Sequence, residues 1–125
     1  MKSNAAVWFE IYVQNMPRAK KFYEAVFQRE LKQLHSPISG LEMWQFEGDA
    51  NSYGVPGALV KMQGVPSGGN STLVYFGCKD CTVEAERVIT HGGGIDRPKM
   101  AIGEYGFIVL AHDTEGNMIG LHSMS

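Results

Sequence analysis

The same order of secondary-structure signals occurs twice along the chain, at an offset of about 65 residues. In the first half, Trp8 to Val13 is rich in aromatic and β-branched residues, which predicts a strand, and Asn15 then supplies a helix N-cap. In the second half, Thr72 to Cys78 and Asp80 occupy the equivalent positions. The fold must therefore contain one small module twice.

Each predicted strand is followed by an amphipathic helix. The first begins after Asn15, and its apolar residues recur at the spacing of one helix face: Ala19, Phe22, Tyr23 and Val26. The second is expected over Thr82 to His91, with an apolar stripe of Cys81, Ala85, Val88 and Ile89. Gly92 to Gly94 then supply the glycine that ends a helix in the left-handed conformation.

Three shorter strand candidates follow each helix. They are Glu30 to His35, Leu41 to Glu47 and Gly57 to Met62 in the first half, and Gly94 to Met100, Tyr105 to His112 and Asn117 to Ser123 in the second. The turn at Asp113 to Asn117 joins the last two as a hairpin. The pattern βαβββ, repeated, predicts an α+β fold in which each helix covers one sheet face and leaves the other free.

The length of 125 residues allows one ordinary domain, which we expect over residues 1–125. Within it we expect module one at 5–62, a polar linker at 63–71 and module two at 72–125. The linker between the two modules is too short to separate them into independent domains.

Charge and hydropathy exclude several classes of partner. The formal net charge is −2, so the chain has no basic surplus for binding nucleic acid or an anionic membrane. No apolar run approaches the ~20 residues that span a bilayer. The run Ala5 to Phe9 is broken by Glu10 and leads to no signal-peptide cleavage site, so we expect a cytoplasmic protein.

Alternation along the first strand predicts a binding surface. Phe9, Ile11 and Val13 form a purely apolar row, which belongs under the helix. The opposite row, Trp8, Glu10 and Tyr12, then faces the free side of the sheet. A lining that mixes aromatic groups with one carboxylate is typical of a pocket for a small molecule.

Several of these segments, in this order, resemble the glyoxalase/bleomycin resistance/extradiol dioxygenase superfamily, also called vicinal oxygen chelate proteins, and within it the lactoylglutathione lyase-related enzymes. The resembling stretches are Trp8 to Val13, Arg18 to Phe27, Gly57 to Val60 and Asp113 to Leu121. The resemblance implies two βαβββ modules whose sheets curl into an open cup with the helices outside. It also implies a homodimer.

In metal-dependent members of this superfamily, the resemblance places metal ligands at the positions of Trp8, Leu73 and Gly120, and near Ala58 to Val60. A divalent ion needs several nitrogen, oxygen or sulfur donors. The side chains at these positions supply none. We therefore expect a protein without a divalent metal or other cofactor, which puts glyoxalase or dioxygenase chemistry in doubt.

Glu10 and His122 are the candidate catalytic residues. Glu10 could bind a ligand or act as a general base, or it could be a hydrogen-bonded structural carboxylate. His122 lies two residues beyond Gly120, so both share one face of the last strand, where His122 could complete an acid–base pair or simply be solvated.

Four further residues complete the predicted binding surface with Trp8. Tyr12 lies beside Glu10, while Leu73 and Tyr75 are the repeat equivalents of Trp8 and Glu10. Gly120 leaves room where the superfamily has a carboxylate, so a ligand group could occupy it.

Cys78 and Cys81 form a C-x-x-C pair at a strand-to-helix junction, where a helix N-terminus can lower a thiol pKa. A redox motif is one interpretation. The alternative is that both thiols pack as small apolar groups, because Cys78 takes the place of Val13 on the helix-facing row and Cys81 lies on the helix stripe.

Three functions remain open. The first is binding of a small, partly apolar molecule in the cup by Trp8, Tyr12 and Tyr75, with Glu10 as polar anchor. The second is a lyase or isomerase in which Glu10 abstracts a proton next to a carbonyl and His122 or a divalent ion stabilises the enolate. The third is a thiol redox protein. The sequence identifies neither the ligand nor whether the protein is an enzyme.

Overall fold

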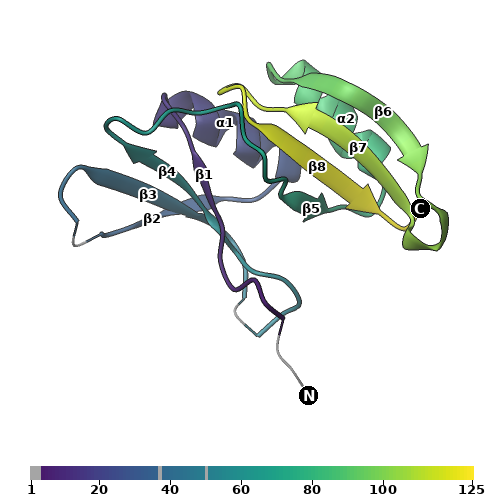
Figure 1. Ribbon diagram of the computed structural model, residues 1–125, viewed down its shortest axis with the longest axis horizontal. Helices are drawn as coiled ribbons and strands as arrows, with labels where there is room; N and C mark the ends of the chain where they lie inside the picture. Colours follow the sequence, from purple (N-terminus) through teal and green to yellow (C-terminus); the bar gives the residue numbers. More distant parts are fainter. Residues whose placement is uncertain (1–3, 37, 50) are drawn as a thin grey trace.

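The chain forms two four-stranded sheets, each carrying one helix, in a computed structural model that describes residues 4–36, 38–49 and 51–125 (Figure 1). The first sheet has the order β1-β4-β3-β2 and the second β5-β8-β7-β6. The elements of the first module are β1 (Glu10–Tyr12), α1 (Met16–Phe27), β2 (Leu31–Leu34), β3 (Leu41–Phe46) and β4 (Ala58–Met62). Those of the second are β5 (Tyr75–Gly77), α2 (Cys81–Thr90), β6 (Gly94–Ala101), the 3-10 helix η1 (Gly103–Tyr105), β7 (Phe107–His112) and β8 (Met118–Ser123).

The two modules have the same topology, which confirms the predicted α+β fold of paired βαβββ units. In each, the first strand lies at the sheet edge and pairs in parallel with the last, while the remaining pairs are antiparallel. The predicted caps are also confirmed. Asn15 accepts a hydrogen bond from the backbone N–H of Arg18, and Asp80 accepts one from that of Thr82.

The two helices pack on the same side of the sheets and bury the core (Figure 1). All four residues of the predicted α1 stripe are buried. In α2, Cys81 and Val88 are buried, but Ile89 is 61% exposed, so its place in the predicted stripe is wrong. Because each helical residue turns by about 100°, the residue after Val88 points away from the sheet.

An aromatic cluster joins the core of one module to that of the other. The ring of Phe76 in β5 stacks on Phe27 at the end of α1, with 4.3 Å between ring centroids, and meets the edge of Phe9 at 6.0 Å. Tyr23 packs beside the same rings. The two modules therefore share one apolar core on their helix side.

The opposite side of the sheets is open, and the predicted alternation on β1 is confirmed. Ile11 and Val13 are buried on the helix side, whereas Glu10 is exposed on the other. The sheets do not close into a barrel, which is consistent with a cup. The segment between β4 and β5 passes between β1 and β8 on its way across the molecule (Figure 1).

Both first strands are shorter than predicted. Hydrogen bonding of β1 to β4 extends only from the Phe9 carbonyl to the Val13 N–H, so Trp8 precedes the ladder. In the second module, Leu73 likewise lies before β5. Each strand pairs with a neighbour on one side only. The partner of Glu10 is Ala58, the first residue of β4, whereas β8 begins two residues before Gly120, the partner of Tyr75. Within the described ranges, no helix has both the length and the hydropathy that crossing a membrane requires.

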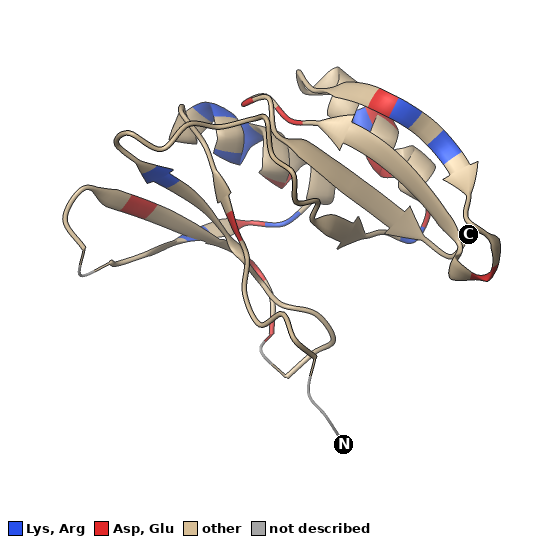
Figure 2. Cartoon of the chain, viewed as in Figure 1, with Lys and Arg blue, Asp and Glu red and all other residues tan. Residues whose placement is uncertain are grey.

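Charged residues are unevenly distributed over this framework. Figure 2 shows Lys and Arg on α1 and on outer strands such as β6, whereas β7 and β8 contain no charged residue other than histidine. The open side of the second sheet is therefore poor in fixed charge along its two central strands.

Candidate ligand cavity between the two modules

A cavity of about 400 Å³ lies where the first module meets the second. Its lining comes from residues 8–12, from alternate residues within 66–74, and from 117–119. We call it the seam cavity. Its size falls in the range that holds small organic ligands, and its walls combine apolar side chains with a few polar groups.

Glu10 is held at the seam cavity by its two neighbours on the same strand face. Its Oε1 accepts a hydrogen bond from the Tyr12 hydroxyl at 2.9 Å, and its Oε2 accepts one from the Trp8 indole N–H at 3.3 Å. The hydrogen bond to Glu10, followed by partial burial, raises the pKa of Tyr12 above its usual value of 10.0. The phenol therefore stays a donor, and Trp8, Glu10 and Tyr12 act as one unit.

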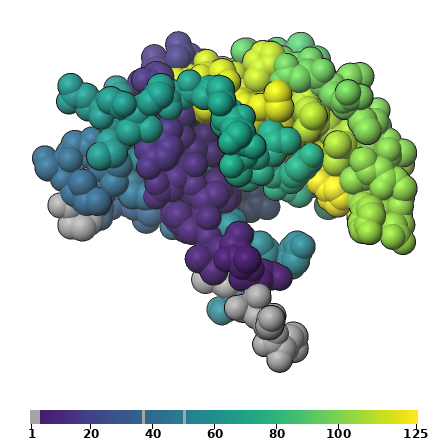
Figure 3. Space-filling model, viewed as in Figure 1, coloured from purple at the N-terminus to yellow at the C-terminus, as the bar shows by residue number. Residues whose placement is uncertain are grey.

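The linker forms the opposite wall and is fastened to β1. The Ser67 hydroxyl donates to the Tyr12 carbonyl at 2.6 Å, and the Asn117 side-chain amide donates to the same oxygen at 2.9 Å. Asn117 also accepts from the Gly68 N–H at 2.7 Å. Figure 3 shows the teal atoms of the linker beside the purple atoms of the first strand. These bonds fix the distance between the cavity walls.

Gly68 is required where the linker crosses the turn between β7 and β8. Its φ is +82°, a left-handed conformation that favours glycine. A Cβ at this position would lie 3.0 Å from the carbonyl oxygen of Gly116. The linker can therefore approach the turn closely only because this residue has no side chain.

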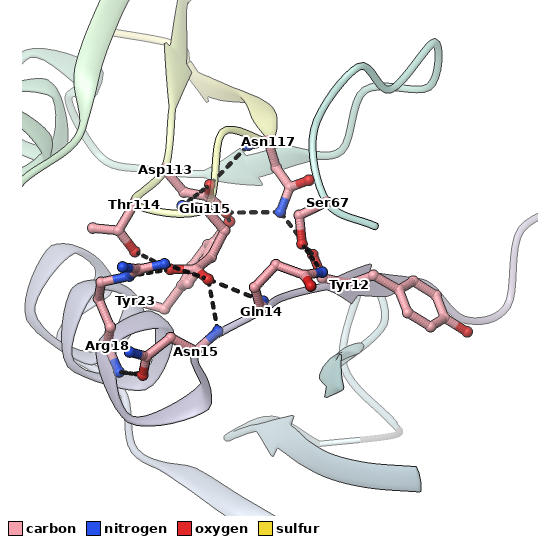
Figure 4. A network of polar contacts seen from close by, with 10 residues as sticks. All are labelled: Tyr12, Gln14, Asn15, Arg18, Tyr23, Ser67, Asp113, Thr114, Glu115 and Asn117. Carbon is pink, nitrogen blue, oxygen red and sulfur yellow. Dashed lines mark hydrogen bonds and ion pairs between the residues drawn. The ribbon is translucent and has the colours of Figure 1, made fainter. Parts of the chain in front are cut away.

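The turn between β7 and β8 anchors the start of α1 through Glu115 (Figure 4). The Glu115 side chain is 0% exposed, and one of its oxygens accepts from the backbone N–H groups of Gln14 and Asn15 at 2.9 and 2.8 Å. Arg18 donates to both oxygens, at 2.6 and 3.0 Å. Burial alone would raise the Glu115 pKa, but these donors outweigh it and lower the pKa to about 2.

Asp113 holds the other half of the same network. Its carboxylate accepts from the buried Tyr23 hydroxyl at 2.6 Å and from the backbone N–H groups of Glu115 and Asn117, each at 2.8 Å. Burial and the neighbouring Asp113 carboxylate raise the pKa of Tyr23 well above its usual value. Figure 4 shows Tyr12 at the edge of this network, with its ring directed away from it.

The sequence predicted residues 113–117 as a hairpin turn within a stretch that resembles the superfamily, but not their role in anchoring α1. One sequence feature pointed to this role: the turn contains three acidic or amide side chains, Asp113, Glu115 and Asn117, which is more than a turn of this length requires. Nothing in the sequence shows that Glu115 lies beside Arg18. The linker residues that line the seam cavity were missed for the same reason.

Tyr75 and Gly120 lie together on the second sheet, because β5 pairs in parallel with β8 at these residues. A Cβ at Gly120 would overlap the Tyr75 ring, so that ring covers the glycine. The room that we expected for a ligand group at Gly120 is therefore filled. Tyr75 itself is 47% exposed.

His122 and Leu73 are also absent from the lining of the seam cavity. The His122 Nε2 lies 2.6 Å from the Tyr105 carbonyl oxygen. One of the two ring nitrogens therefore already has a hydrogen-bond partner. The structure therefore brings Glu10 together with Trp8 and Tyr12, and not with His122. The assignments of Glu10, His122, Trp8, Tyr12, Leu73, Tyr75 and Gly120 to a site stay predictions.

The thiols are placed as packing groups. Burial, with the Glu84 carboxylate nearby, raises the pKa of Cys78 from 9.0 to about 12, and Cys81 is fully buried. A redox-active thiol needs thiolate at neutral pH. This environment favours the packing interpretation over the redox one.

The positions that the superfamily uses for a divalent ion do not fit one here. Trp8 donates its N–H to Glu10, Ala58 and Val60 are buried and apolar, and Gly120 lies under the Tyr75 ring. Within residues 4–36, 38–49 and 51–125, no three His, Cys, Asp or Glu side chains are grouped to hold a metal ion. That the protein works without metal stays a prediction.

No family model and no curated protein matches the chain. Among solved structures, glyoxalase I from Zea mays superposes with a TM-score of 0.73 at 20% identity, over 94% of this chain and 45% of that one. A glyoxalase/bleomycin resistance protein from Streptomyces sp. CB03234 gives 0.66 at 23% identity, over 95% and 100%. The chain has the glyoxalase/bleomycin resistance fold.

A third structure with this fold is TnmS3, an antibiotic binding protein from the same Streptomyces strain, with a TM-score of 0.68 at 23% identity over 100% of both chains. The chain spans about half the length of the maize enzyme. At these identities, the likeness shows the glyoxalase/bleomycin resistance fold and nothing about the ligand.

Proposed function

We propose that this chain binds a small, partly apolar organic molecule in the seam cavity. The observation that carries the proposal is the Trp8–Glu10–Tyr12 unit, in which two aromatic side chains hold a carboxylate at the wall of a 400 Å³ cavity. A cavity with apolar walls and one oriented polar group is the usual form of a small-molecule site.

The fold neighbours are compatible with a binding function. TnmS3 is described as an antibiotic binding protein and shares the fold over its full length. Glyoxalase I shares the fold as well and is an enzyme, so the fold permits both functions. The choice between them depends on the residues of the cavity.

The lyase or isomerase alternative has less support from those residues. A base that removes a proton next to a carbonyl needs a partner that stabilises the enolate. Among the residues that the structure describes, the cavity lining places no histidine, lysine or arginine near Glu10, and His122 lies elsewhere on the second sheet. The thiol redox alternative is disfavoured by the high pKa of Cys78.

The homodimer rests on the family resemblance, and we retain it as part of the proposal. Light scattering after size-exclusion chromatography tests it directly, with a mass of two chains expected and a mass of one chain contradicting it. The cytoplasmic location and the single-domain organisation with its linker at 63–71 also stay predictions.

A thermal-shift screen of small aromatic and heterocyclic metabolites tests the proposed function. A ligand present at about 100 times its Kd stabilises the folded state by about 2.7 kcal/mol, which raises Tm by several degrees. We expect hits whose effect is lost in Trp8→Ala. The control is Tyr53→Ala, because Tyr53 is fully exposed in the loop between β3 and β4. Hits that survive Trp8→Ala would contradict the proposal.

A further inference from the structure

The charged groups that line the seam cavity are of one sign only among the described residues. Glu10 is its single charged lining residue among those that the structure describes. Within residues 4–36, 38–49 and 51–125, no lysine, arginine or histidine contributes to the lining. A bound molecule therefore meets one acidic group, and no described lining residue carries the opposite charge.

Glu10 differs in this respect from the carboxylates that form ion pairs elsewhere in the molecule. Glu115 pairs with Arg18 and Asp80 pairs with Lys99, whereas within the described ranges Glu10 has no basic side chain within ion-pair distance. Its two hydrogen bonds, from Trp8 and Tyr12, use about half of the lone-pair positions of a carboxylate. The carboxylate therefore keeps free acceptor positions for a ligand.

The donors to Glu10 are also aromatic rings. An indole or phenol ring attracts a cation to its face, and the attraction strengthens as water is excluded. Trp8 is 37% exposed and Tyr12 is partly buried, so both rings are available to a molecule in the seam cavity.

We propose that the seam cavity selects small aromatic organic cations, such as N-alkylated or protonated heterocycles. The positive charge lies against the Glu10 carboxylate, and the ring system contacts Trp8 or Tyr12. This rests on the proposed function, whose ligand class it specifies.

The same features disfavour the other charge types. An anion would lose water beside the Glu10 carboxylate and find no positively charged group in the described lining to offset the repulsion. Such repulsion of the wrong ligand contributes to selectivity. A bare divalent ion would find one carboxylate where it needs several oxygen ligands. A neutral ring would fill the cavity but gain nothing from Glu10.

Three probes of similar shape test this proposal: 1-methylquinolinium, the neutral 1-methylnaphthalene and the anion 1-naphthoate. Isothermal titration calorimetry measures their Kd values for the full chain at neutral pH. We expect the cation to bind about tenfold tighter than the neutral probe, and the anion to bind weakest. Added salt should weaken binding of the cation more than that of the neutral probe.

Glu10→Gln should abolish the preference for the cation and leave binding of the neutral probe within about twofold. Glu42→Gln is the matched control, because Glu42 accepts a hydrogen bond from the Trp44 indole in the same i, i+2 arrangement, on the helix side of the same sheet. It should retain the preference. Circular dichroism and the Tm of each variant confirm that both remain folded.

The outcomes separate the two proposals. Equal binding of cation and neutral probe in the unmodified chain, or a preference that persists in Glu10→Gln, would overturn the selectivity for cations and leave the cavity as a binding site. Failure of every probe to bind would contradict both the selectivity and the proposed function.

Discussion

Glu115, in the turn between β7 and β8, accepts a hydrogen bond at 2.6 Å from Arg18 in α1, which is 97 residues away in the sequence. The same carboxylate accepts hydrogen bonds from the backbone N–H groups of Gln14 and Asn15, which follow β1 after Val13. One buried side chain of the second module thus fixes the path of the first strand as it leaves the seam cavity. The position of Tyr12, and through it that of Glu10, depends on this contact.

Glu115→Gln should lower the free energy of unfolding by about 2–3 kcal/mol, because it leaves a guanidinium without its buried partner. The cost stays below that of a fully buried pair because the Arg18 side chain is 52% exposed and can be hydrated. Urea unfolding at pH 7 measures the change. Glu86→Gln, on the exposed side of α2, is the control and should cost less than about 0.5 kcal/mol. Equal effects of both substitutions would show that the network contributes nothing.

Acid should weaken the fold through the same residue. The Glu115 pKa is lowered from its ordinary 4.5 to about 2 by folding, so its contribution to stability is complete above about pH 4.5 and is lost as the pH falls toward 2. The linked free energy amounts to about 3 kcal/mol. Unfolding of the unmodified chain and of Glu115→Gln across this range should converge at low pH. A constant difference between them at every pH would contradict the role given to Glu115.

Gly57→Ala should destabilise the protein by about 2–4 kcal/mol, because the added methyl group would overlap the Phe9 ring and φ is +69° at this position. Gly54→Ala is a matched control, since its φ of +89° imposes similar backbone strain while nothing lies within 4 Å of the new methyl group. It should cost about 1 kcal/mol. Thermal unfolding separates the two, and equal costs would show that Phe9 simply moves aside.

The Cys78 thiol should react slowly in the folded protein. With a pKa of about 12, almost none of it is thiolate at pH 7.5. Iodoacetamide labelling followed by mass spectrometry of peptides should show modification at least tenfold slower in the folded chain than in urea. Rapid labelling of Cys78 in the folded state would revive the redox interpretation.

Local signals in the sequence predicted the framework well. Asn15 and Asp80 cap their helices as expected, and the end of α2 is followed by Gly92 with a φ of +97°. These features depend on residues close together in the chain. The alternation of side chains along β1 is equally local, and it correctly placed Glu10 on the open face of the sheet.

The rest of the site depends on long-range packing, which local patterns do not encode. The linker wall exists because Ser67 and Asn117 meet the Tyr12 carbonyl from distant parts of the chain. Gly120 was expected to leave space, but the rotamer of Tyr75 closes it. Leu73 was assigned by repeat symmetry and precedes β5 as Trp8 precedes β1, yet it is absent from the lining of the seam cavity. The repeat equivalents of the Glu10 surface therefore do not line the seam cavity.

The indole N–H signals of the two tryptophans give the most direct test of the seam cavity as the binding site. In a ¹H–¹⁵N correlation spectrum of the full chain, the Trp8 signal reports on the hydrogen bond to Glu10, and the Trp44 signal reports on the opposite side of the same sheet. Titration with 1-methylquinolinium should shift the Trp8 signal progressively while the Trp44 signal stays in place. A Trp8 signal that does not move, or equal movement of both signals, would contradict a ligand site built around Trp8, Glu10 and Tyr12.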